Sequence, residues 1–220
     1  MSTPAPVKTT EPIERLVVFR HPLISHKLAA LRDARTGHRP FRALMSQIAG
    51  LMVYEVTRSF ETTPVTVQTP MGPAPCARIE RPVTVVPVLR AGLGMTDGVL
   101  ELMPEARVGH LGLVRDERTL LPTTYLKKLP KDLDAGPVIL IDPMLATGGS
   151  AVEAARILRE AGAVDLRMIC LVAAPEGVRR LTEADPGLTI YTAALDERTN
   201  EKGYILPGLG DAGDRLYGTG

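Results

Sequence analysis

Residues 138–151 combine residue types that could hold a phosphate group. Four apolar residues, typical of a buried strand, are followed by Asp142, and the chain then reaches Thr147, the glycine pair 148–149 and Ser150. Glycine permits backbone conformations in which successive N–H groups converge on one anion. A helix that begins directly after the glycines adds unpaired N–H groups and the positive end of its dipole. The pattern predicts a phosphate-binding loop in which Thr147 and Ser150 add hydroxyl donors and Asp142 can bind sugar hydroxyls or a metal ion.

Other interpretations of these glycine-rich patterns are less favoured. A plain strand, turn and helix with Ser150 as the N-cap would not explain why the acid and the Thr-Gly-Gly-Ser run occur together. A nucleotide hydrolase loop needs a lysine after the glycines, and the chain has no Gly-Lys-Ser or Gly-Lys-Thr. A dinucleotide fingerprint occurs formally at 208–213, but we expect no room after it for a helix or a βαβ unit.

Two arginines stand in surroundings that suit an anionic substrate. Arg90 follows an apolar run and precedes Ala-Gly-Leu-Gly, whose small residues let backbone N–H groups approach an anion while the guanidinium binds its oxygens. The alternative for Arg90 is a charge at a strand end that faces water. Arg115 lies in a charged cluster between two short strand-like pieces, a pattern more typical of a solvated hairpin.

The elements expected to position these residues alternate between strands and helices. Apolar residues at helical spacing predict two helices ahead of the main sheet, over 22–35 and 40–60, and alternation predicts a strand over 65–68 that runs into a turn. Further along, the expected strands are 83–89, 138–142, 166–173 and 188–192, and the expected helices are 95–102, 151–161 and 177–183. This order indicates an α/β fold with a parallel sheet and helices on both faces. Ligands of such sheets bind beyond the carboxyl ends of the strands, where the site is expected.

The bulk composition narrows the class of protein. The chain has 220 residues, 45% hydrophobic and 23% charged, which is typical of one globular domain. A formal net charge of +1 and 4% aromatic residues argue against a broad surface for nucleic acid or anionic membrane. No apolar run approaches the roughly 20 residues that span a bilayer, and the first residues lack a signal peptide's apolar stretch. We expect a cytoplasmic protein with a disordered tail over 1–12 and a single domain over 13–220.

The cysteines and histidines indicate neither a disulfide framework nor a metal site. Cys170 lies in an apolar run and is expected to be a buried thiol, whereas Cys76 lies in a proline-rich segment expected to be a loop. The four histidines lack metal-ligand spacing, and His21 and His26 are expected to cap or pack helices.

Residues 142–150, reading Asp-Pro-Met-Leu-Ala-Thr-Gly-Gly-Ser, resemble the phosphoribosyl pyrophosphate (PRPP) loop of the type I phosphoribosyltransferases in the wording of the uracil-specific branch. Other members usually carry a second acid where this chain has Pro143, so Asp142 would act alone. Four further segments resemble the same branch: the N-terminal 21–28, the pyrophosphate loop 87–95, the flexible arm 115–119 and the uracil site 200–213. The resemblance covers nearly the whole chain after the tail.

The resemblance implies a phosphoribosyltransferase fold with a flexible β-arm and a small C-terminal base-binding hood, here residues 194–220. It implies an enzyme of pyrimidine salvage that joins uracil to PRPP, forms UMP and releases pyrophosphate, with Mg²⁺ held through PRPP. Members commonly form homodimers or larger homo-oligomers, and some respond to GTP, so GTP is a candidate effector. Two alternatives on the same fold are a pyrimidine-responsive RNA-binding regulator and an enzyme that takes a purine.

The resemblance also implies the site residues. Arg90 and Arg115 would bind the pyrophosphate, Arg115 from an arm that closes over the substrate. The full set of PRPP contacts would be Arg90, Arg115, Asp142, Pro143, Met144, Leu145, Ala146, Thr147, Gly148, Gly149, Ser150 and Asp211. The uracil contacts would be Ile205, Gly210, Asp211 and Ala212. Arg90, Arg115, Asp142 and Asp211 would serve catalysis, and Asp211 would either orient the ribose or ease proton loss from uracil.

Overall fold

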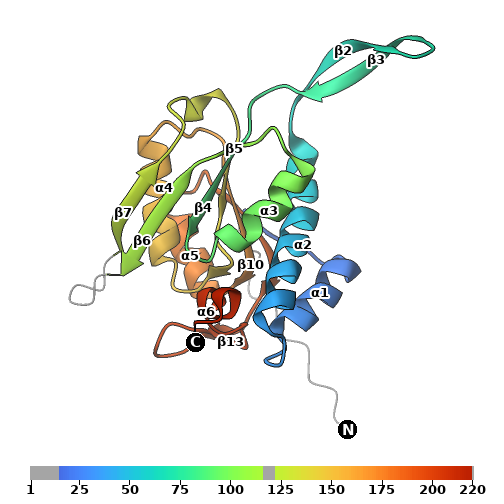
Figure 1. The fold of residues 1–220 in the computed structure, drawn as a ribbon. Coiled ribbons are helices and arrows are strands. Elements are labelled where there is room, and N and C mark those ends of the chain that lie inside the picture. Colours follow the sequence, from blue (N-terminus) through green and yellow to red (C-terminus); the bar gives the residue numbers. More distant parts are fainter. Residues whose placement is uncertain (1–14, 116–121, 220) are drawn as a thin grey trace.

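The computed structural model describes residues 15–115 and 122–219, and its centre is a mostly parallel sheet of order β1-β11-β10-β8-β4-β6-β7 (Figure 1). The strands of this path are β1 (Leu16–Val18), β4 (Thr84–Leu89), β6 (His110–Arg115), β7 (Pro122–Lys128), β8 (Val138–Ile141), β10 (Leu166–Ala173) and β11 (Thr189–Leu195). Two short strands lie off the path: β5 (Arg107–Val108) pairs with β4, and β9 (Met144–Leu145) pairs with β10. Only the β6–β7 pair of the path is antiparallel. The predicted parallel sheet is confirmed.

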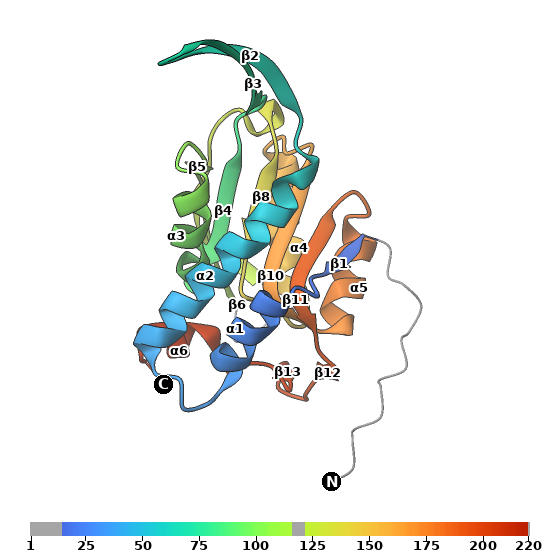
Figure 2. The same ribbon diagram turned by 90° about the vertical axis from the view of Figure 1, so that its right-hand side faces the viewer.

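Helices cover both faces of this sheet (Figure 2). One face packs against α1 (Pro22–Arg32), α2 (His38–Val56), α3 (Leu93–Leu102) and α6 (Ala212–Tyr217). The other face packs against α4 (Gly149–Glu160) and α5 (Pro175–Ala184). Within β8, Ile139 and Ile141 face the first layer and Val138 and Leu140 the second, because successive strand residues point to opposite faces. A strand buried on both faces therefore reads as an unbroken apolar run.

Side-chain contacts explain where α1 begins and ends. His21 is the N-cap of α1, and its Nδ1 accepts a hydrogen bond from Leu23 N–H at 3.2 Å, which confirms the expected capping role. The helix expected over 22–35 ends at Arg32, because Asp33 accepts a hydrogen bond from Arg35 N–H and forms a turn. The helix expected over 40–60 also ends early, at Val56, and continues as one 3₁₀ turn.

A two-stranded hairpin, β2 (Thr62–Thr69) and β3 (Gly72–Ile79), projects from the amino-terminal end of the sheet (Figure 1). The predicted strand and turn are confirmed, but the partner strand β3 was not predicted, because its prolines argue against a strand interior. Cys76, expected in a loop, lies in β3 and is exposed. Cys170 is buried as expected, and burial raises the pKa of its thiol to about 12.

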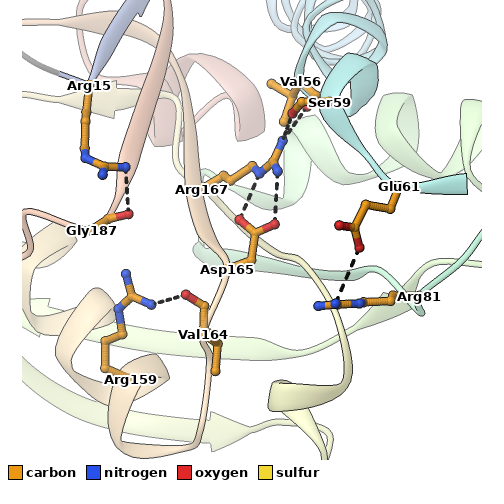
Figure 3. A network of polar contacts seen from close by, with 10 residues as sticks. All are labelled: Arg15, Val56, Ser59, Glu61, Arg81, Arg159, Val164, Asp165, Arg167 and Gly187. Carbon is orange, nitrogen blue, oxygen red and sulfur yellow. Dashed lines mark hydrogen bonds and ion pairs between the residues drawn. The ribbon is translucent and has the colours of Figure 1, made fainter.

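The amino-terminal ends of the strands are held by a polar network (Figure 3). Arg167 of β10 forms a bidentate pair with Asp165 at 3.0 Å and donates to Val56 O at 2.8 Å, so it ties β10 to the end of α2. Arg159 donates to Val164 O at 2.6 Å in the same region. These contacts satisfy backbone carbonyls and charges at the edge opposite the expected site, and their role is structural.

The C-terminal hood begins where β11 ends. It contains a small antiparallel pair, β12 (Arg198–Thr199) and β13 (Ile205–Leu206), followed by α6. The expectation that no helix fits after residues 208–213 was wrong: the side chain of Asp211 caps the six-residue α6 by accepting from Asp214 N–H at 3.0 Å. A βαβ unit is still absent from this part of the described chain. Within the described residues, no helix is long and apolar enough to cross a bilayer.

Candidate functional site

Two loops meet at the carboxyl edge of the sheet, where β4 and β8 lie side by side. The pyrophosphate loop (residues 87–95) passes so close to the end of β8 that a Cβ on Gly92 would lie 2.7 Å from Ile141 O. Arg90 is exposed in this loop, and Asp142 follows Ile141 directly. The sheet therefore brings the loops of Arg90 and Asp142 together, as the sequence predicted.

The phosphate loop (residues 142–150) has two different halves. Its first half belongs to the sheet: Pro143 O accepts from Leu171 N–H at 3.0 Å, and Leu145 O accepts from Ala174 N–H at 2.9 Å. Its second half is free, since no hydrogen bond within the described chain uses the N–H groups of residues 147–150 or the hydroxyls of Thr147 and Ser150. The N–H groups of residues 147–150 are therefore available to an anion.

Gly148 gives this second half its shape. It is the N-cap of α4 in the left-handed conformation, with φ of 80°, and a Cβ there would lie 2.9 Å from Gly177 O. Ser150 is therefore not the cap, and the plain strand–turn–helix interpretation was wrong in that respect. Ser150 instead sits exposed in the first turn of α4, where its N–H has no partner within the helix.

The carboxyl group of Asp142 forms no ion pair within the described residues. Its Oδ1 accepts a hydrogen bond from Met144 N–H at 3.2 Å, and no arginine or lysine of the described residues pairs with it. The residue keeps a solvent-accessible rim, but the surrounding protein atoms raise the pKa of its carboxyl to about 7 against the lowering effect of the Met144 bond. Such a group gains most from a substrate that brings hydroxyl donors.

The first turns of α5 connect the phosphate loop to the hood. A Cβ on Gly177 would overlap Ala146 O, so the helix packs directly on the loop. Arg180 Nη1 donates to Thr147 O at 3.4 Å, and Glu176 Oε1 accepts from Thr199 N–H of β12 at 3.4 Å. The second carboxylate oxygen of Glu176 is buried without a hydrogen-bond partner among the described residues. Sequence reasoning missed these three residues, because they carry no motif of their own.

The hood meets the pyrophosphate loop through Tyr217 of α6. The guanidinium carbon of Arg90 lies 5.7 Å from the centroid of the Tyr217 ring, and Tyr217 Oη donates to Arg90 O at 3.2 Å. One side chain thus contacts both the charged group and the backbone of Arg90. Nothing in the sequence pointed to Tyr217.

The predicted uracil contacts lie together in the hood but offer different groups. The side chains of Ile205 and Ala212 are buried in the core, so only their backbone groups can reach a base. Gly210 and Asp211 are exposed. The turn between β12 and β13 borders a hollow of about 450 Å³.

Arg115 is the last residue of β6, which runs parallel to β4. Since Leu89 at the end of β4 pairs with Gly112, the backbone of Arg115 lies beyond the carboxyl edge, on the side of the site. Asp116, Glu117 and Thr119 of the expected arm lie outside the described residues.

The described residues offer little to a metal ion. They contain no group of three or more His, Cys, Asp or Glu side chains that could hold one. Mg²⁺ prefers oxygen ligands and often takes one carboxylate with substrate phosphates and water. The lone Asp142 beside a phosphate loop fits an ion held mainly by its substrate.

Comparison with known proteins gives consistent matches over most of the chain. The family model described as uracil phosphoribosyltransferase matches residues 17–219. The chain is 55% identical to a uracil phosphoribosyltransferase of Halalkalibacterium halodurans over 208 residues, which cover 94% of this chain and 100% of the relative. It is 54% identical, with the same coverage, to a uracil phosphoribosyltransferase of Staphylococcus epidermidis.

Two solved structures extend the comparison to the fold. The AQ2163 protein of Aquifex aeolicus matches with a TM-score of 0.89 and 37% identity, covering 93% of this chain and 98% of that chain. A hypoxanthine-guanine phosphoribosyltransferase of Bacillus anthracis matches with a TM-score of 0.51 and 11% identity, covering 72% of this chain and 80% of that chain. The second likeness concerns the fold alone.

Proposed function

The chain belongs to the uracil phosphoribosyltransferase family, and from this premise we propose how its own residues perform the transfer. It is a pentosyltransferase of pyrimidine salvage that joins uracil to PRPP, forming UMP and pyrophosphate. The observation that carries the proposal is the meeting of three segments at one edge of the sheet. These are the pyrophosphate loop, the phosphate loop with its unused N–H groups, and the hood.

The second half of the phosphate loop binds the 5′-phosphate of PRPP. The N–H groups of residues 147–150 and the hydroxyls of Thr147 and Ser150 are its donors, and the positive end of α4 adds to the attraction. Asp142 accepts hydrogen bonds from the ribose hydroxyls. Binding energy gained at this remote phosphate holds the anomeric carbon in line for attack.

Arg90 and Arg115 stabilise the negative charge that grows on the pyrophosphate as the bond to the anomeric carbon breaks. This contribution is electrostatic and needs no covalent intermediate with the protein. Asp142 and the phosphate oxygens of PRPP would hold Mg²⁺, which would supply further neutralisation of the charge on the pyrophosphate.

The hood selects uracil through backbone groups of Ile205, Gly210, Asp211 and Ala212. A wrong base would leave such groups unpaired, which penalises it strongly. The capping bond from Asp214 N–H fixes the Asp211 carboxylate. This favours a role in orienting the ribose over a role in removing a proton from uracil.

The proposed activity predicts that the purified protein makes UMP and releases pyrophosphate when mixed with uracil, PRPP and Mg²⁺. A coupled pyrophosphate assay, with UMP identified by chromatography, measures this. Hypoxanthine and adenine in place of uracil should give rates lower by orders of magnitude. A failure to form UMP, or a preference for a purine, would contradict the proposal. No finding favours an RNA-binding regulator.

The assembly we propose is a homodimer in which a second copy covers the hairpin of β2 and β3. Two-stranded hairpins are marginally stable in water without further packing, and Met71 at the tip is 96% exposed. Light scattering after size exclusion should give twice the 23.7 kDa of one chain. A variant with a short turn in place of residues 62–79 should be a folded monomer. A monomeric parent protein, or a variant that still dimerises, would refute this assembly.

A cytoplasmic location and GTP as an effector also remain proposals. The effector rests on the resemblance to the family, some members of which respond to GTP. Measuring the initial rate with and without GTP tests the effector.

A further inference from the structure

Residues 207–211, which lead to the predicted uracil contacts of Gly210–Ala212, form no helix or strand that would fix their shape. Between β13 and α6, Gly208 adopts a left-handed conformation with φ of 61°, and a Cβ there would overlap Ile205 O. Local preferences of the chain therefore do not determine where the following residues lie. Contacts from elsewhere in the molecule must hold the segment.

One ion pair supplies two of these contacts, both to Gly208. Arg32, the last residue of α1, binds Asp196 in a bidentate manner, with Nη2–Oδ1 at 2.6 Å and Nη1–Oδ2 at 2.8 Å. Arg32 Nη1 also donates to Gly208 O at 2.7 Å, and Asp196 Oδ2 accepts from Gly208 N–H at 3.0 Å. Both polar backbone groups of a single buried glycine are thus held by the two members of the pair.

The pair is itself anchored and mostly removed from water. The side chains of Arg32 and Asp196 are 22% and 6% exposed. Asp196 N–H donates to Ala173 O at the end of β10, so the carboxylate is fixed relative to the sheet. A buried ion pair is weak evidence for stability, because an apolar pair of similar volume often serves as well. The charged groups of Arg32 and Asp196 instead orient the Gly208 peptide through their two hydrogen bonds to it.

We infer that Arg32 and Asp196 are positioning residues for uracil, which fix the Gly208 peptide and through it the backbone groups of Gly210–Ala212 that read the base. This inference rests on the proposed function and adds two residues that touch neither substrate. They act on the base through the hood alone and leave the PRPP contacts on the phosphate loop in place.

Arg32→Lys and Asp196→Asn test the pair in the purified full-length protein. Lysine keeps the positive charge but cannot form the bidentate contact of the guanidinium. Asparagine keeps the shape of aspartate but has one acceptor oxygen in place of two. Each variant should raise KM for uracil by about tenfold or more, since a hydrogen bond to a charged group is lost. The KM for PRPP and kcat at saturating uracil should change much less. Unchanged KM for uracil, or an equal rise of both KM values, would overturn the inference.

A matched pair far from the site controls for a general loss of stability. Arg159 also binds Asp185 through two hydrogen bonds, from Nε at 2.7 Å and from Nη2 at 3.0 Å, and the two side chains are 28% and 15% exposed. Arg159→Lys and Asp185→Asn should lower the thermal unfolding temperature to a similar degree and leave KM for uracil unchanged. A similar rise of KM for uracil in this control pair would overturn the inference.

The double variant Arg32→Met with Asp196→Leu separates folding from positioning. It leaves no unpaired buried charge, so it should unfold at a higher temperature than either single variant. Its KM for uracil should stay high, because neither apolar side chain can hold the Gly208 peptide. A double variant with the parent KM would overturn the inference. Parent protein that makes no UMP would refute the proposed function instead.

Discussion

Replacement of Arg90 by alanine should lower kcat/KM for PRPP by roughly 10²- to 10³-fold, the usual loss when one preorganised donor to a developing anion is removed. The stability of the folded protein should change little. Arg90 is exposed, and its guanidinium carbon lies 5.7 Å from the centroid of the Tyr217 ring. An exposed cation–π contact contributes about 0.5–1 kcal/mol, so the thermal unfolding temperature should fall by no more than about 4 °C.

Two further variants make this result specific to the guanidinium. Arg90→Lys retains the charge without the bidentate fork and should recover part of the lost activity. Arg81→Ala removes an exposed arginine at the opposite edge of the sheet, where its contact is Glu61 at 3.4 Å, and should leave the kinetics unchanged. Steady-state kinetics with PRPP varied at saturating uracil gives the comparison. An Arg90→Ala enzyme with parent activity, or one that does not fold, would contradict the assigned role.

Asp142→Asn should make the enzyme more stable at neutral and alkaline pH while it loses most of its activity. The pKa of the Asp142 carboxyl is about 7 in the folded protein against 3.8 as the ordinary value, because burial opposes its charge. Between these two values the folded state binds more protons than the unfolded state, so the free energy of unfolding falls as the pH rises. Above pH 7 the whole penalty is present, and below about pH 4 it vanishes.

Asparagine carries no charge and should escape this penalty. The gain at pH 8 should be on the order of 2–4 kcal/mol, from about 1.4 kcal/mol per unit of pKa, and should raise the unfolding temperature by roughly 5–10 °C. At pH 4 the two proteins should unfold at the same temperature. Activity should fall by roughly 10²-fold, because the amide cannot accept both ribose hydroxyls. Stability that increases on removing a group while function is lost marks a residue kept for its chemistry.

Thermal unfolding between pH 4 and 8, without substrate, measures this prediction. Asp132→Asn is the contrasting variant: its bond to Arg107 lowers the pKa of the Asp132 carboxyl, so its charged form is favoured and its loss cannot stabilise the protein at pH 8. If the Asp142→Asn curve ran parallel to that of the parent protein across this range, the carboxyl would not be buried as described.

Local patterns were enough to predict much of this molecule. The alternation of apolar strands with amphipathic helices gave the parallel sheet, because the periods of strand and helix are properties of neighbouring residues. The wording of residues 142–150 identified the phosphate loop, since the acid, the glycines and the hydroxyls that bind an anion stand close together in the chain. The family followed from such segments, and it is confirmed.

Contacts between segments far apart in the chain could not be predicted from such local patterns. Gly148, not Ser150, caps α4 at the point where α5 packs on the loop, and burial raises the pKa of the Asp142 carboxyl. Arg32 lies 176 positions from Gly208, and no periodicity or motif joins them. Tyr217 reaches Arg90 across 127 positions in the same way. A site whose groups lie within one loop can be predicted from the sequence, because those residues are neighbours in the chain. The burial of a side chain and its distant partners depend on the tertiary structure, because they form only when the chain folds.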